Sequence, residues 1–277
     1  MSLYVPSAHQ VPGDGTELPD AGIMDDVPFE TFKWAPEHLE VATWLRSDDA
    51  SDVGIGSTVT PGDMPAHSNA DNGADSIFVG ANPTLEDASA LEGIPYLDWS
   101  ANVGSWNMGK TNMPSGGEPF SLAMVMYHPQ TKATDGDIEM MSYGDGSDHA
   151  GMRTGDEGDA HYYQWWNGSN TSSFPSVITR QGWYYWIFRY RHADVEYDIW
   201  VQPLGGSLET DTQSIGGGAM GWDRTNGGHI LGQNFSGSGG AWGSYFYEYL
   251  ADAAAWTNQQ VENLRGYFSG RYGFAGV

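Results

Sequence analysis

The sequence predicts an all-β protein that ends in a single short helix. Gly accounts for 38 of the 277 residues, aromatic residues make up 13%, and clusters of turn residues separate short apolar runs. A sheet protein with many loops needs this composition, because aromatic and β-branched residues favour strands while glycine permits tight turns. All-β sandwiches commonly reach about 200–250 residues as one unit, so the length fits one large domain.

Strand patterning is clearest in the middle of the chain, in residues 121–127, 183–190 and 195–201. Each of these segments alternates apolar and polar residues or is continuously apolar over the length of a strand. Only residues 191–194 separate the last two segments, so we expect them to form a β-hairpin. We expect no helix of note before residue 257.

The C-terminal segment carries the signals of one amphipathic helix. Thr257 and Gln260 have the spacing of a capping box, in which each side chain satisfies a free backbone N–H at the helix start. Trp256 and Val261 fit the hydrophobic staple that accompanies such a cap. Gly270 is expected to end the helix, since glycine readily adopts the left-handed conformation found there. The apolar residues that share one face at helical spacing are Val261, Leu264, Tyr267 and Phe268.

A series of landmarks follows the chain in a fixed order between residues 36 and 275. They are residues 44–49, 82–85, 93–99, 119–126, 140–144 and 228–232, and then a last strand, a capped helix and Tyr-Gly. This order resembles the concanavalin A-like, laminin-G-like jelly-roll family. The resemblance implies a jelly-roll β-sandwich over residues 36–277, with one short helix at its C-terminal end.

The chain is strongly acidic, with 36 Asp and Glu residues against 11 Lys and Arg residues and a net charge of −25. Repulsion among so many like charges weakens the compact state, whereas molar salt shortens the Debye length to about 3 Å and screens the repulsion. With only three lysines, the composition is typical of proteins from halophilic organisms. An ordinary acidic marine or phage protein is the alternative. The charge argues against nucleic acid or an anionic membrane as a partner.

Several absences bear on the location of the protein. The chain has no cysteine, which excludes disulfides and cysteine–zinc sites. Residues 1–10 lack the basic head and apolar core of a signal peptide, and no apolar run of about 18 residues could span a membrane. The family that the chain resembles is mostly found outside cells. A place on the virion surface reconciles these facts, because viral structural proteins leave the cell by assembly and lysis; an unprocessed cytoplasmic protein is the alternative.

Residues 1–35 differ from the rest of the chain, because they are rich in proline and acidic residues and show little periodicity. Such a segment could not bury enough apolar surface to fold alone. Its short apolar pieces predict an extended N-terminal arm that anchors the domain to other virion structural proteins. A disordered tail, or a strand packed on its own domain, is the alternative. We expect the assembly to be a homo-oligomer.

Related jelly rolls include glycosidases, so the carboxylates of residues 194–198 are candidates for catalysis. Asp194, Glu196 and Asp198 alternate along one strand face, and a retaining hydrolase needs two carboxylates about 5 Å apart. The glucanase signature that this segment resembles has Glu at both outer positions and Asp at the centre, so every member is exchanged. We therefore expect no enzymatic activity and regard a glycoside hydrolase as the least favoured alternative.

Paired carboxylates in glycine-containing loops suggest a structural calcium ion, because hard cations prefer clustered oxygen ligands. Asp145 and Asp148 are the first candidate ligands, although no spacing matches an EF-hand. In a chain this acidic, such pairs also arise by chance. No other cofactor is expected.

Aromatic residues are concentrated in the middle of the chain, and some of them have polar neighbours suited to sugars. Sugar rings stack on Trp and Tyr while their hydroxyls bond to groups such as Asp and Asn. The predicted carbohydrate site consists of Asp159, His161, Trp165, Trp166, Asn167, Trp222, Asp223 and Asn226. Trp183 and Trp186 are expected in the core instead, since most aromatic residues of a large sandwich are buried.

These features together predict a non-enzymatic surface protein of a halophilic virus. It would be a capsid decoration, spike, turret or fibre module, and host surface glycans are its expected ligands. The alternative is a cellular glycan-binding or adhesion module of a halophile.

Overall fold

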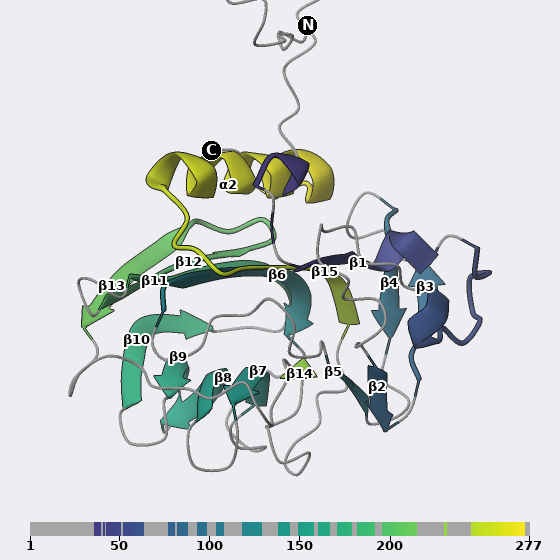
Figure 1. Cartoon of the computed structure of the whole chain (residues 1–277), viewed down its shortest axis with the longest axis horizontal. Helices are drawn as coiled ribbons and strands as arrows, with labels where there is room; N and C mark the ends of the chain where they lie inside the picture. The colour runs from purple at the N-terminus through teal and green to yellow at the C-terminus, as the bar shows by residue number, and fades with distance from the viewer. Residues whose placement is uncertain are drawn as a thin grey trace, which may run out of the picture.

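The computed structural model is a β-sandwich covered on one side by a helix (Figure 1), which confirms the predicted all-β class with a C-terminal helix. The predicted arm, residues 1–35, lies outside the described residues. The described residues are 36–39, 41, 43–50, 52–63, 77–80, 82–87, 93–98, 104–107, 118–128, 138–144, 149–157, 160–166, 171–178, 182–191, 196–214, 230–231 and 245–274.

The larger sheet, called sheet I, has eight antiparallel strands within the described residues. In spatial order they are β13 (Glu209–Ser214), β12 (Glu196–Pro203), β11 (Gly182–Arg191), β6 (Phe120–His128), β15 (Tyr245–Asp252), β4 (Pro95–Asp98) and β3 (Thr84–Asp87), while β1 (Thr43–Arg46) pairs with β15. The predicted hairpin is confirmed, because β11 and β12 pair from Arg191 opposite Glu196 to Tyr184 opposite Pro203.

The smaller sheet, called sheet II, has seven antiparallel strands in the described part of the chain, and only its backbone is described. In spatial order they are β10 (Thr171–Ile178), β9 (Ala160–Trp166), β8 (His149–Glu157), β7 (Ile138–Gly144), β14 (Ile230–Leu231), β5 (Gly104–Asn107) and β2 (Ile77–Gly80). Sheet II lies against one face of sheet I, and helix α2 (Asn258–Tyr272) lies across the other face (Figure 1).

Because sheet I has a layer on each side, its central strands are buried on both faces. Every residue of β11 from 183 to 190 is buried, and so is every residue of β6 from 120 to 126. This double burial explains why these segments are almost continuously apolar rather than alternating, with Ser121 and Arg189 as their buried polar residues. Trp183 and Trp186 are both buried, as the sequence predicted.

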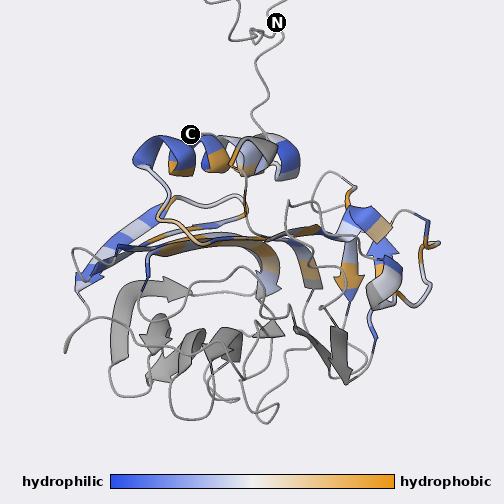
Figure 2. Cartoon of the chain, viewed as in Figure 1, coloured by the Kyte–Doolittle hydropathy of each residue, from blue (hydrophilic) through white to orange (hydrophobic). Residues whose placement is uncertain are grey.

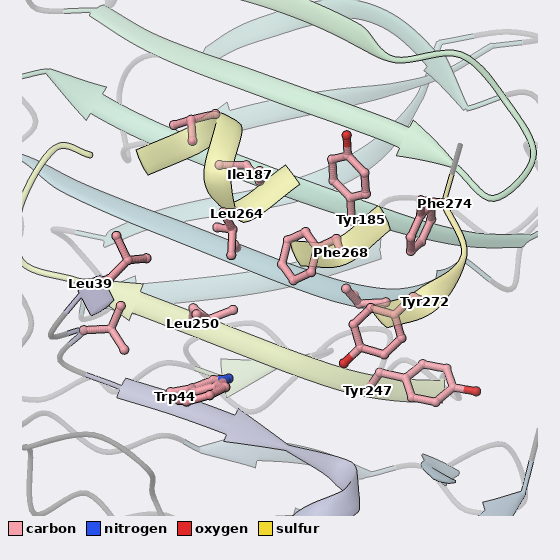
Figure 3. Close-up of a cluster of buried hydrophobic side chains, with 14 of the residues drawn as sticks. Leu39, Trp44, Tyr185, Ile187, Tyr247, Leu250, Leu264, Phe268, Tyr272 and Phe274 are labelled. Atoms are coloured by element: carbon pink, nitrogen blue, oxygen red, sulfur yellow. The ribbon is translucent and has the colours of Figure 1, made fainter. Parts of the chain in front are cut away.

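An aromatic and aliphatic core fills the space between α2 and sheet I (Figure 3). Leu264 and Phe268 of α2 meet Tyr185 and Ile187 of β11, and the Phe268 and Tyr185 rings lie 5.4 Å apart between centroids. The apolar side of α2 faces the sheet (Figure 2). Full burial of each large apolar side chain contributes about 1.5–3 kcal/mol to stability. Packing in this core, rather than intrinsic helix propensity, therefore stabilises α2.

The start of α2 agrees with the sequence prediction in detail. The backbone N–H of Gln260 donates to Thr257 Oγ1 at 3.2 Å, and the N–H of Thr257 donates to Gln260 Oε1 at 2.7 Å, which completes the capping box. Trp256 and Val261 are both buried in the core under α2, as the staple requires.

The predicted end of α2 at Gly270 is wrong. The helix continues to Tyr272, and Gly273 ends it with a left-handed φ of 70° and an N–H that donates to Ser269 O. The physical reason is that Tyr272 and Phe274 are buried in the same core. The apolar face of the helix therefore extends beyond Phe268, the last apolar residue of the predicted face. Before residue 257 the helical segments of the described chain are the short 3-10 turns η2 (Pro36–Leu39), η3 (Ser47–Ala50) and η4 (Pro61–Asp63). Among all these helices, none has the length and apolar content that crossing a bilayer requires.

The glycines of α2 give a test of this boundary. Gly266 and Gly270 have no atom within 4 Å of an added Cβ, so Gly266→Ala and Gly270→Ala should each raise the free energy of unfolding by about 0.5–1 kcal/mol. Gly273→Ala should lower it by a similar amount, since alanine is strained at positive φ. Urea denaturation of the three variants measures both effects. A destabilised Gly270→Ala would mean that the helix ends earlier.

Candidate functional site

The predicted carbohydrate site is only partly within the described residues. His161, Trp165 and Trp166 belong to β9 of sheet II, where the backbone is described. The five other predicted residues lie outside the described residues: Asp159, Asn167, Trp222, Asp223 and Asn226. The candidate calcium ligands Asp145 and Asp148 also lie outside them. In the part of the chain that is described, no three His, Asp or Glu side chains are close enough to hold a metal ion.

The structure does not bring His161, Trp165 and Trp166 to one face of sheet II. Successive residues of a strand belong to opposite faces, so Trp165 shares a face with His161 while Trp166 lies on the other face. The pairing of β9 is continuous through this stretch, with Met152 and Ser172 opposite Trp165, and with Gly151 and Thr171 opposite Trp166.

The registers of sheet II extend these two positions into two rows of residues across all seven strands. Directly paired residues share a face, so each row is read from the backbone pairing alone. The Trp165 row is Ser172, Trp165, Met152, Met141, Leu231, Trp106 and Phe78. The Trp166 row is Thr171, Trp166, Gly151, Ser142, Ile230, Asn107 and Ile77. The first row is almost wholly apolar, whereas the second is mostly polar or small.

The carboxylates that the sequence offered for catalysis are held by arginines on the face of sheet I that carries α2. Asp198 accepts hydrogen bonds from Arg189 Nε at 2.9 Å, from Arg191 Nε at 2.9 Å and from Thr212 Oγ1 at 2.7 Å. Glu196 accepts from Arg191 Nη2 at 2.7 Å. Asp194, the third member of the alternation, lies outside the described residues.

The protonation state of Asp198 follows from these contacts. Burial by itself raises the pKa of the Asp198 carboxyl, but the hydrogen bonds from Arg191, Thr212 and Arg189 outweigh it and leave the pKa below its usual range. Asp198 is therefore an ionised partner for two arginines. A general acid needs the opposite, namely a carboxyl that keeps its proton near neutral pH.

Sequence reasoning missed a buried carboxylate in β15. Glu248 is fully buried and accepts three hydrogen bonds, from Trp44 Nε1 at 2.5 Å, Tyr272 OH at 2.5 Å and Tyr267 OH at 3.0 Å. The donors come from β1 and α2, so this one side chain joins three elements. The available signal is a single acidic residue between aromatic residues in the apolar run that precedes Asp252 in this strand.

No family model and no curated protein matches the chain. Among solved structures, the full-length tailspike protein 2 of Escherichia coli O157:H7 bacteriophage CAB120 is similar, with 12% identity, a TM-score of 0.53 and coverage of 72% of this chain and 28% of the tailspike. The enzymatically active domain of the bacteriophage CBA120 tailspike protein 2 gives 12% identity, a TM-score of 0.50 and coverage of 72% and 31%. Ruminococcus gnavus IT-sialidase CBM40, bound to α2,3-sialyllactose, gives 13% identity, a TM-score of 0.39 and coverage of 52% and 80%.

The tailspike likeness shows that the chain has a known β-sandwich fold. At this identity it shows the fold alone, because unrelated functions share one fold. The chain spans less than a third of the tailspike that it resembles, so the activity of that whole protein does not transfer to it.

Proposed function

We propose that this chain is a non-enzymatic glycan-binding module of a virion surface, and that the face of sheet II that carries Trp166 is its binding face. The observation that carries the proposal is the separation of the two rows of sheet II. An antiparallel sheet that packs on one side places its apolar face on the core and its polar face toward water. The apolar Trp165 row is suited to the interior of the sandwich, and the polar Trp166 row is suited to a ligand.

The layer order supports the choice of sheet II over sheet I. Helix α2 and its core occupy the outer face of sheet I (Figure 1), so a ligand could not reach the middle of that face. Gly151 is paired with Trp166, and Ser142 is paired with Gly151; glycine and serine are small residue types, which suit a position beside an indole that stacks on a sugar ring. Gln164 belongs to the same face of β9 and adds an amide that could bond to hydroxyls.

The arrangement of Asp198 and Glu196 favours a binding role over glycoside hydrolysis. Asp198 and Glu196 are both engaged by arginines, and Asp198 is buried on the side of sheet I under α2, away from sheet II. A glycoside hydrolase would need one free nucleophile and one protonated acid in a cleft. This observation supports the non-enzymatic form of the proposal.

The viral context rests on composition and on the fold. A net charge of −25 with only three lysines favours a protein that works in high salt. A domain of similar fold occurs in a bacteriophage tailspike. We therefore place the module on the surface of a halophilic virus, as a homo-oligomer attached to other virion proteins through the arm of residues 1–35. A cellular adhesion module of a halophile is the second candidate, since the same composition favours it.

A glycan array in molar salt tests the binding proposal. The purified chain should bind a subset of glycans, and Trp166→Ala should weaken binding to them at least about tenfold, since loss of one stacked aromatic costs on the order of 1.4 kcal/mol. Trp165→Ala is the matched control from the neighbouring position. It should lower the denaturation midpoint and leave the affinity of the folded fraction unchanged.

The outcomes separate the alternatives. Equal loss of affinity in the two variants would mean that the two faces are not distinguished as proposed. No binding to any glycan would overturn the glycan-binding function and favour a purely structural role. Release of sugar from a bound glycan would overturn the non-enzymatic assignment.

A further inference from the structure

The buried carboxylate of Glu248 lies where the C-terminal half of α2 meets the sheet. Tyr272 and Tyr267 donate to it from α2, and Trp44 donates to it from β1. Arg271 of α2 places Nε at 3.7 Å from Glu248 Oε2, which is an ion pair but too long for a hydrogen bond. The last two turns of α2 thus converge on one side chain of β15.

The charged groups around this carboxylate come from each neighbouring element. Arg271 is shared, because its Nη2 lies 2.6 Å from Asp48 Oδ2 of η3. Arg46 of β1 is engaged by Asp49 of η3, at 2.8 Å. Burial and the nearby Glu248 raise the pKa of Tyr272 and of Tyr267, so both phenols keep their protons.

Glu248 therefore accepts its hydrogen bonds from neutral donors. Among the described residues, the cation within 4 Å of it, Arg271, is shared with Asp48, while Arg46 on the paired strand is engaged by Asp49. Burial raises the pKa of Glu248, and Arg271 with the hydrogen bonds from Tyr272, Trp44 and Tyr267 lowers it only part of the way back. In the closed state, in which α2 is packed against sheet I, Glu248 can be either ionised or protonated. A protonated Glu248 can donate to the Tyr272 hydroxyl, because a phenol both donates and accepts.

We propose that Glu248 is a proton-binding site that controls how firmly the C-terminal half of α2 is held against sheet I. The device is independent of glycan binding, because it lies on the face of sheet I opposite to sheet II. It makes the outer layer of the molecule responsive to pH while the strands of the sandwich stay paired.

The direction of the response follows from proton linkage. When α2 separates from β15, Glu248 becomes exposed to solvent and its pKa returns to the ordinary value of about 4.3. The closed state has the higher pKa and binds the proton more tightly. The stability of the closed state is therefore fully present below the ordinary pKa and is lost as the pH rises through the closed-state pKa. Within that window, the opening constant increases by up to about tenfold per pH unit and then levels off.

Hydrogen exchange of the α2 amides in residues 264–272 measures this opening. The full chain and its Glu248→Gln variant would be compared from about pH 4 to about pH 9, with rates corrected for intrinsic exchange. Glutamine has the shape of the protonated carboxyl and does not titrate. In the native chain, protection of these amides should fall as the pH rises, while in Glu248→Gln it should stay level.

The control is Glu262→Gln on the same helix, whose side chain is 44% exposed and pairs with Arg265. This variant should keep the pH profile of the native chain. Protection in β11 of the native chain serves as an internal reference, and it should not follow α2. Parallel profiles for the native chain and Glu248→Gln would overturn the proposal, and so would a native profile in which α2 and β11 lose protection together.

Discussion

Replacement of Glu248 with leucine is expected to lower the free energy of unfolding by about 3–5 kcal/mol. The leucine would remove the acceptor of Trp44 Nε1, Tyr267 OH and Tyr272 OH, of which Trp44 and Tyr272 are buried and Tyr267 is half-buried. Each unsatisfied buried donor costs about 1–3 kcal/mol. Urea denaturation in molar salt gives the size of the loss.

Glu262→Leu is the matched control, because it removes an acidic residue from the outside of α2. The Glu262 side chain is 44% exposed, although its partner Arg265 is only 10% exposed, so solvent weakens this pair and its loss should cost about 1 kcal/mol. Similar losses in the two variants would mean that the Glu248 network adds nothing beyond the removal of charge.

Replacement of Asp198 with alanine should cost a similar amount, about 3–5 kcal/mol, for a different reason. Arg189 has a side chain only 10% exposed and would lose its charge partner. Its remaining contacts are to the carbonyl oxygen of Trp256 and to Asn258 Oδ1, both at 2.8 Å, and to the ring of Trp200. These contacts fix the approach to α2, so the loss should also loosen the helix start.

The pH dependence of this variant has a definite sign. The folded pKa of Asp198 lies below its ordinary value of about 3.9, so its contribution to stability is present above that value and is lost as the pH falls through the folded pKa. The native chain should therefore lose more stability below about pH 4 than Asp198→Ala does. Glu196→Ala, at 33% side-chain exposure, should change stability by less than about 1 kcal/mol.

The elements that could be predicted from the sequence are those in which burial and local pattern agree. The β11–β12 hairpin and the start of α2 belong to this class, because apolar continuity and a capping box each act within a few residues. Strand β13 could not be predicted in this way. Its six residues are all polar and none is buried, since an edge strand is stabilised by backbone pairing with β12 rather than by its side chains.

In the candidate site, too, residue types can be predicted from the sequence, whereas their arrangement depends on strand pairing and distant contacts. Composition alone could select Trp165 and Trp166 as sugar-stacking residues, but two adjacent aromatic residues look equivalent until the register of β9 assigns them to different rows. Glu248 was missed because its partners Trp44 and Tyr272 come from distant parts of the chain. Asp198 can be picked out as an acid from the sequence, but its charge is balanced by Arg189 and Arg191, and only the pairing of β11 with β12 brings Arg189 opposite it and Arg191 beside it.

The position of β15 has a consequence for how the protein is made on the ribosome. This strand follows all of the other described strands in the chain, yet it lies between β6 on one side and β1 and β4 on the other. Until residues 245–252 have been translated, β6 has an open edge, and the core under α2 has no cover. An open apolar edge is prone to pair with other chains. We therefore expect the nascent chain to be most prone to self-association in the interval before β15 and α2 emerge.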